Sequence, residues 1–122
     1  MIKVLIIDDD NKNIYALSAT LRSRAFSTVS AMTAKDGIEM LEKDPAIGVI
    51  LMDMMMPDMD GYEAIREIKG DRKFKYLPVI AVTAQAMNGD REKCLAAGAD
   101  YYIPKPIDVD QLLMILGKYV KN

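Results

Sequence analysis

Charged and hydroxyl-bearing side chains follow four apolar segments of the chain. They are Asp8, Asp9 and Asp10 after residues 3–7, Asp53 after residues 48–52, Thr83 at the end of residues 78–83, and Lys105 after residues 100–103. Aspartate is an established nucleophile that forms acyl phosphates. A lysine ammonium and a threonine hydroxyl can stabilise a phosphoryl group through position and charge. If these side chains meet at one place, they supply the parts of a phosphoryl-transfer site.

The aspartates impose an electrostatic condition on such a site. Carboxylates brought close together repel one another, and one of them is pushed toward protonation. A divalent cation removes this conflict, and Mg²⁺ suits a site that supplies one or two carboxylates and leaves room for water and a phosphoryl oxygen. The sequence therefore indicates Mg²⁺ as the cofactor, with Mn²⁺ as a substitute. Taken one at a time, the same residues also fit a solvated turn, a strand end and a surface lysine.

The composition excludes several classes of protein. The chain has 122 residues, enough for one domain, and its net charge of −2 lacks the basic excess of a nucleic-acid-binding surface. The single cysteine, Cys94, permits no internal disulfide, which favours the cytoplasm. No apolar run reaches the ~20 residues of a membrane span, and the start of the chain turns acidic too early for a signal peptide.

The chain contains no histidine. Ser-His-Asp catalysis, Cys-His catalysis and histidine metal ligands within the chain are therefore excluded.

Apolar runs alternate with helical patterns along the chain. The expected strands are residues 3–7, 27–31, 48–52, 78–83 and 100–103, and the continuous runs among them are typical of strands buried on both faces of a parallel sheet. The expected helices are residues 12–24, 34–43, 62–69, 89–97 and 109–120. Thr33, Asp60 and Asp108 are expected to cap helix starts, and Gly98 is expected to end the fourth helix.

Five strand–helix repeats predict an α/β fold with an open parallel sheet covered by helices on both faces. The common small solution has the strand order 2-1-3-4-5. Ligands in such sheets bind outside the carboxyl ends of the strands, beside strand 1. The residues that follow the strands then share one edge, which favours the phosphoryl-transfer interpretation over separate structural roles.

At this point the sequence resembles the receiver domain of two-component response regulators. The matching segments are "VLIIDDD" (4–10), "ILMDMMMPDMDG" (50–61), "PVIAVTA" (78–84) and "YYIPKPI" (101–107), which span nearly the whole chain. Residues 89–112 look especially like receivers of hybrid histidine kinases and phosphorelays. The resemblance implies a three-layer flavodoxin-like (βα)5 sandwich. It also implies a single receiver domain over residues 1–122, with no output domain.

The resemblance implies a role for each residue at the expected edge. Asp53 is the implied phospho-acceptor, and Thr83 and Lys105 contact the phosphoryl group. The implied Mg²⁺ site consists of Asp8, Asp9, Asp53 and the backbone carbonyl of Met55. The family usually has a cis peptide bond before the proline that matches Pro106.

The resemblance also implies a switch and a control of phosphoryl lifetime. Thr83 and Tyr102 are the implied switch pair, and the surface that changes is helix 4, strand 5 and helix 5, roughly residues 84–118. Met55 and Gln85 flank the path of the water that hydrolyses the phosphoryl group. A thioether directs water poorly and an amide is a weak proton acceptor, so slow self-hydrolysis is expected.

The implied partner is a histidine kinase or a histidine phosphotransfer protein as phosphodonor. The chain is expected to catalyse only its own phosphorylation and dephosphorylation, as a monomer or weak dimer without direct contact with nucleic acid. The cognate kinase and the output target are not identified by the sequence.

Three other functions need similar residues or the same topology. A phosphatase of the haloacid-dehalogenase type uses an aspartate after strand 1 with a second acid two residues on, and Asp8 and Asp10 have that spacing. A flavodoxin-type protein places hydroxyl residues, rather than the acidic residues 8–10, around the flavin phosphate. A third alternative is a receiver that serves only as a docking module. Such a protein does not need the complete set of residues that accept a phosphoryl group, and this sequence contains that set.

Overall fold

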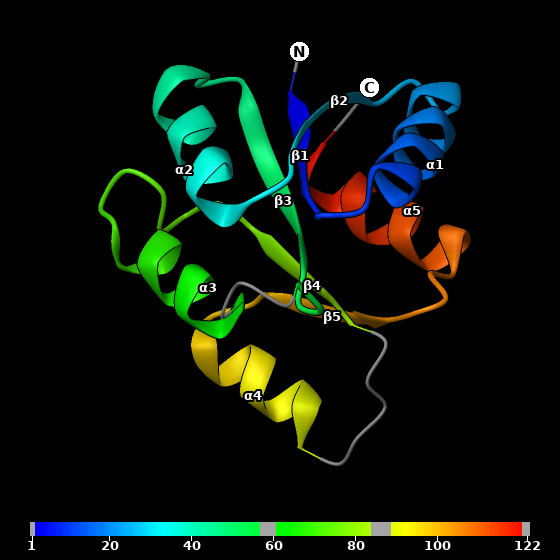
Figure 1. Cartoon of the computed structure of the whole chain (residues 1–122). Helices are drawn as coiled ribbons and strands as arrows, with labels where there is room; N and C mark the ends of the chain where they lie inside the picture. The colour runs from blue at the N-terminus through cyan, green and yellow to red at the C-terminus, as the bar shows by residue number, and fades with distance from the viewer. Residues whose placement is uncertain (1, 57–60, 84–88, 121–122) are drawn as a thin grey trace.

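The computed structural model describes residues 2–56, 61–83 and 89–120 of the chain. Strands and helices alternate through these residues (Figure 1). The strands are β1 (Lys3–Ile7), β2 (Ser27–Ala31), β3 (Ile47–Asp53), β4 (Val79–Thr83) and β5 (Tyr101–Pro104). The helices are α1 (Asn11–Ser23), α2 (Ala34–Lys43), α3 (Gly61–Gly70), α4 (Asp90–Ala97) and α5 (Val109–Tyr119). None of these helices is long and apolar enough to cross a bilayer.

All strand pairs in the sheet are parallel, and the strand order is β2-β1-β3-β4-β5. Helices α1 and α5 cover one face of the sheet, and α2, α3 and α4 cover the other (Figure 1). The predicted α/β sandwich and its strand order are therefore confirmed.

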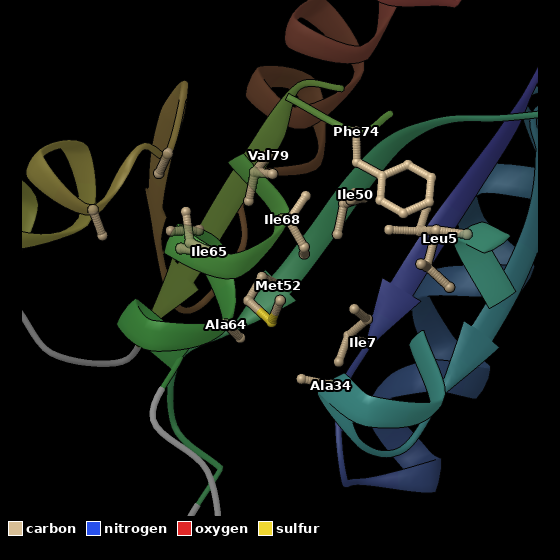
Figure 2. Close-up of a cluster of buried hydrophobic side chains, with 14 of the residues drawn as sticks. Leu5, Ile7, Ala34, Ile50, Met52, Ala64, Ile65, Ile68, Phe74 and Val79 are labelled. Carbon is tan, nitrogen blue, oxygen red and sulfur yellow. The ribbon is translucent and has the colours of Figure 1, made fainter. Parts of the chain in front are cut away.

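Apolar side chains of the central strands fill a core on each side of the sheet. Leu5 and Ile7 of β1 belong to the cluster beneath α2, α3 and α4, whereas Val4 and Ile6 belong to the cluster beneath α1 and α5. Successive residues of a strand face opposite sides, so a strand buried on both faces is continuously apolar. Figure 2 shows the first cluster, in which Met52 of β3 lies beside α3.

Capping residues account for several of the helix boundaries. Thr33 accepts a hydrogen bond from the Asp36 backbone N–H, and Asp108 accepts one from the Gln111 N–H, as N-caps do. Gly98 adopts a left-handed conformation with φ of 118° directly after α4. The caps expected at Thr33 and Asp108 and the stop expected at Gly98 are confirmed. Asp60 lies outside the described residues.

Several boundaries differ from the expected ones by one or two residues. Strand β3 begins at Ile47 and includes Asp53, because Asp53 still pairs with Val82 of β4. Strand β5 is shifted one residue toward the C-terminus, to Tyr101–Pro104, because Thr83 pairs with Pro104. The sheet therefore extends to the residues expected to carry the chemistry and fixes their backbone.

Candidate functional site

Three carboxylates meet at the carboxyl edge of the sheet. Asp8 and Asp9 follow β1 and Asp53 ends β3, the neighbouring strand, and each offers an oxygen within 4.8 Å of the others. Asp8 and Asp53 are 4% and 5% exposed, whereas Asp9 is exposed. Together with Lys105 we call this group the acidic rim. Two buried acids and one exposed acid form a charged patch with one side open to solvent.

Lys105 supplies the positive charge of the acidic rim. Its ammonium donates to Asp53 Oδ1 at 3.3 Å, and the Met55 backbone N–H donates to the same oxygen at 2.9 Å. The Lys105 backbone N–H donates to the Thr83 carbonyl at 2.7 Å, which extends the pairing of β4 and β5 past the end of β5. The peptide bond from Lys105 to Pro106 is cis. These contacts hold the Lys105 side chain against the end of β3.

The ionised form of Asp8 is disfavoured in this arrangement. Burial raises the pKa of Asp8 to about 6. A hydrogen bond from the Asp10 backbone N–H opposes the rise, and the negative charge of Asp53 adds to it. A cation between the carboxylates would remove this penalty. The donor set consists of oxygens, and it fits Mg²⁺.

Thr83 lies beside the acidic rim and is almost completely buried. Its hydroxyl contacts the Met55 sulfur at 3.4 Å, and the Met55 side chain is 41% exposed. Met55 therefore covers Thr83 from the solvent side. Tyr102, one strand away on β5, packs partly buried against the core beneath α3 and α4. Gln85 lies outside the described residues.

Asp10 does not join the other acids that follow β1. Its side chain accepts from the Lys12 backbone N–H at 2.8 Å and caps α1. Asp8 and Asp10 have the spacing that fits a phosphatase, but Asp10 caps a helix instead of joining Asp8 at the site. The capping role was open to prediction, because an aspartate directly before a helical pattern favours this position.

A cavity of about 310 Å³ opens beside the acidic rim and was not predicted. It runs between α1 and the segment that joins β5 to α5. Asn13, Leu17, Ile107 and Val109 line it, together with Asp8, Asp53 and Lys105. Leu17 also packs partly buried against the core beneath α1 and α5, and a sequence pattern does not reveal a gap in that packing.

Comparison with known proteins extends these observations. Residues 4–116 match the family model of the response regulator receiver domain. The response regulator DivK of Brucella ovis is 30% identical over 117 residues, a match that covers 96% of this chain and 94% of DivK. Hybrid signal transduction histidine kinase L of Dictyostelium discoideum is 35% identical over 98% of this chain. The chain spans 7% of that kinase, and it spans 14% of the rice protein "Probable histidine kinase 6".

Solved structures share the same fold. The receiver domain of the sensor histidine kinase PA1611 from Pseudomonas aeruginosa PAO1, which has a magnesium ion coordinated in its active site cleft, is 33% identical with a TM-score of 0.86. That match covers 98% of each chain. The Ssk1 receiver of Saccharomyces cerevisiae, solved with the phosphotransfer protein Ypd1, is 24% identical with a TM-score of 0.86, over 97% of this chain and 88% of its own. With its parallel sheet, its acidic rim and a family match over residues 4–116, this chain belongs to the response regulator receiver domain family of two-component signalling.

Proposed function

We propose that Asp53 accepts a phosphoryl group from a phosphohistidine on a partner protein or domain, in a reaction that requires Mg²⁺. The observation that carries this proposal is the meeting of three carboxylates within 4.8 Å, with the Lys105 ammonium 3.3 Å from Asp53 Oδ1. A purely structural carboxylate at a strand end needs neither two acidic neighbours nor a lysine. An acceptor that must hold a cation and a phosphoryl group needs both.

The transfer step is a displacement at phosphorus. A carboxylate oxygen of Asp53 forms the new O–P bond as the N–P bond of the phosphohistidine breaks, and the imidazole leaves with the bonding electron pair and takes up a proton. Asp8, Asp9, Asp53 and the Met55 backbone carbonyl would hold Mg²⁺, with Mn²⁺ as a substitute. The bound ion would neutralise charge on the phosphoryl oxygens.

Lys105 and Thr83 would contact the phosphoryl group once it is on Asp53. The Lys105 ammonium already contacts Asp53 Oδ1 and would form an ion pair with a phosphoryl oxygen. Thr83 supplies a hydroxyl donor from the adjacent strand β4. The Met55 sulfur that this hydroxyl contacts is a weak acceptor, so a phosphoryl oxygen competes with it effectively.

The contact between the Thr83 hydroxyl and the phosphoryl group would also start the signal. As the Thr83 hydroxyl turns to the phosphoryl group, the space it leaves admits the ring of Tyr102. Phosphorylation then favours one of two arrangements of α4, β5 and α5. The surface that changes is roughly residues 84–118, of which residues 84–88 lie outside the described residues.

The lifetime of the phosphoryl group is set by access of water. Met55 covers the group with apolar bulk, and Gln85 is proposed to flank the other side of the attack path. Neither side chain is a good proton acceptor, so we expect slow hydrolysis, suited to a relay intermediate or a stored signal.

The partner in this proposal is a histidine kinase or a histidine phosphotransfer protein. The chain is a signalling module that acts in the cytoplasm as a monomer or weak dimer, with no substrate besides its own phosphoryl group and no nucleic-acid contact. Because the relatives include both DivK, which has about the length of this chain, and much longer histidine kinases, the receiver either stands alone or is part of a hybrid kinase.

The test is phosphorylation by acetyl phosphate, measured by intact mass with Mg²⁺ and with EDTA. We expect one phosphoryl adduct in Mg²⁺ and none in EDTA. Asp53→Asn should lose the adduct, whereas Asp36→Asn, which changes an exposed carboxylate in the first turn of α2, should keep it. A phosphoryl adduct that persists in Asp53→Asn would show that another residue is the acceptor.

A further inference from the structure

Met55 lies on the solvent side of the acidic rim and carries a sulfur atom that peroxides oxidise. Of the residues that the structure describes, the exposed methionines are Met32, Met55 and Met114. Met52 and Met56, close to Met55 in sequence, are buried in the core beneath α2, α3 and α4. Oxidation of a methionine requires that the oxidant reach its sulfur. The fold therefore leaves Met55 open to oxidation and protects Met52 and Met56.

The sulfur of Met55 contacts a residue of the proposed phosphoryl site. The Thr83 hydroxyl donates to this sulfur at 3.4 Å. The Met55 backbone N–H donates to Asp53 Oδ1 at 2.9 Å, which holds the Met55 backbone beside the proposed phospho-acceptor. A change in the chemistry of the Met55 sulfur therefore acts on a hydroxyl beside Asp53.

We propose that Met55 is a site of reversible oxidation, at which a peroxide converts the thioether to a sulfoxide that retains the Thr83 hydroxyl. A lone pair of the sulfur attacks one oxygen of hydrogen peroxide, and the S–O bond forms as the O–O bond breaks. The hydroxide that leaves takes the proton from the oxygen now bound to sulfur and becomes water. The sulfur loses two electrons in this step, and the peroxide gains them.

Oxidation changes the strength of the acceptor that Thr83 meets. A thioether sulfur is a weak acceptor, whereas the S–O group of a sulfoxide is polar. The Thr83 hydroxyl would then donate to the sulfoxide oxygen and be withheld from a phosphoryl oxygen on Asp53. This inference rests on the proposed function, which assigns the Thr83 hydroxyl to the phosphoryl group. Oxidation of Met55 thus disfavours the phosphorylated arrangement, and reduction of the sulfoxide restores it.

The single cysteine of the chain competes poorly for the oxidant. Cys94 is fully buried in α4, and burial raises the pKa of its thiol to about 11. Oxidation of cysteine proceeds from the thiolate, which this environment disfavours at neutral pH. Mild treatment with peroxide should therefore modify Met55 before Cys94.

The first test measures oxidation without any phosphoryl group. The protein is treated with limiting hydrogen peroxide in EDTA, and tandem mass spectrometry of its peptides gives the oxidised fraction of each methionine. We expect Met55, at 41% exposure, to react at a rate comparable with that of Met32, at 43%, while Met52 stays reduced. The two methionine sulfoxide reductases, which act on one epimer each, should return Met55 to the thioether. If Met55 stays reduced while Met32 is oxidised, the proposal is wrong.

The second test measures the consequence at the phosphoryl site. The affinity for the phosphoryl mimic beryllofluoride in Mg²⁺ is compared before and after oxidation, so that each variant serves as its own reference. Oxidation should weaken binding about 2- to 10-fold in the wild type, the range that corresponds to one net hydrogen bond. It should have the same effect in Met114→Leu, which removes the sulfur of an exposed methionine on α5. It should have no effect in Met55→Leu, which lacks the sulfur, or in Thr83→Val, which lacks the hydroxyl.

The outcomes separate this inference from the proposed function. Equal binding by reduced and oxidised wild type, or an equal loss in Met55→Leu, would overturn the inference and leave the phospho-acceptor assignment intact. A loss that persists in Thr83→Val would show that the sulfoxide does not act through the hydroxyl. Failure of the reduced wild type to bind beryllofluoride would instead overturn the proposed function. Thermal melts show whether each variant is folded, and Thr83→Val gives a second route to the answer if Met55→Leu is not.

Discussion

Carboxylates stand at both ends of the parallel sheet, and their partners differ. At the carboxyl end, Asp8, Asp9 and Asp53 lie together, and the Lys105 ammonium forms an ion pair with Asp53. At the amino end, Asp100 precedes β5, and its Oδ2 accepts from Lys69 Nζ at 2.7 Å and from the Val79 backbone N–H at 2.8 Å. Lys69 also donates to the Leu77 carbonyl at 2.6 Å. We call the second arrangement the rear ion pair.

The difference separates a structural charge from a functional one. The rear ion pair satisfies its carboxylate with groups of the chain itself, and it fixes the segment between α3 and β4. The acidic rim has more negative charge than the chain neutralises, and burial makes the ionised form of Asp8 unfavourable. An excess of this kind is expected where a bound cation or phosphoryl chemistry depends on it. Substitutions at the two ends should therefore have opposite consequences.

The largest contrast is expected between the two lysines. Lys105→Ala should leave the fold intact and slow phosphorylation of Asp53 by acetyl phosphate by about 100-fold, the loss typical for one donor placed at a developing charge. The reason is that its ammonium is the positive charge the chain itself provides at Asp53. The rate of appearance of the phosphoryl adduct in intact mass measures this. A variant that is phosphorylated at the wild-type rate would remove Lys105 from the mechanism.

Lys69→Met tests the other end of the sheet. Methionine keeps the apolar stem of lysine but removes the ammonium, so Asp100 and the Leu77 carbonyl lose a donor. We expect the free energy of unfolding to fall by about 1–2 kcal/mol, since the ion pair is partly exposed. Denaturant titration gives this value. The folded variant should be phosphorylated at the wild-type rate, and a slower rate would mean that the two ends of the sheet are coupled.

Substitution of Asp8 should have a smaller effect, on the free energy of unfolding, and this effect should depend on pH. Its pKa in the folded protein is about 6, above the ordinary value of 3.8, so the folded state binds more protons than the unfolded state between these pH values. Stability is therefore lost as the pH rises through this window. In EDTA at pH 7, Asp8→Asn should raise the free energy of unfolding by about 1 kcal/mol, less than the full shift implies because solvent reaches the rim.

The control for Asp8→Asn is the same measurement well below pH 3.8 and in Mg²⁺. The stabilisation should vanish well below pH 3.8, the ordinary pKa of the group, where Asp8 is protonated in both states. Excess Mg²⁺ should reverse the order of the two proteins, because the ion binds and stabilises the wild type more strongly. A gain that is the same at every pH would indicate altered packing instead of relief of charge.

The contrast between the two ends was only partly visible in the sequence. Continuous apolar runs predicted β1, β3 and β4, and parallel topology brought the residues after them to one edge. The strand boundaries were less certain, because hydrogen bonding between neighbours decides where a strand ends. Asp53 and Pro104 belong to strands through their partners Val82 and Thr83, and a local pattern does not contain those partners.

Pairwise contacts of side chains were the least predictable part. The Tyr62 hydroxyl donates a hydrogen bond to Asp90, 28 positions away, and this bond depends on how α3 and α4 pack side by side. The rear ion pair likewise joins residues distant in sequence, since Lys69 and Asp100 are 31 positions apart. The sequence predicted that one of the clustered carboxylates is pushed toward protonation. Burial of a charge is a property of the packed fold, so only the structure identifies Asp8 as that residue.

The smallest expected effect concerns Met55, whose side chain covers Thr83 at the open side of the acidic rim. Met55→Asn should accelerate loss of the phosphoryl group on the order of 3-fold, equivalent to about 0.6 kcal/mol of barrier, because an amide offers water a polar contact that a thioether does not. Met55→Ala should accelerate loss less, since it only opens access. Decay of the phosphoryl adduct in intact mass, after removal of acetyl phosphate, compares the three proteins. Met114→Ala, at an exposed methionine of α5, is the matched control. If all four decay at one rate, Met55 does not control access of water, and the lifetime depends on other residues.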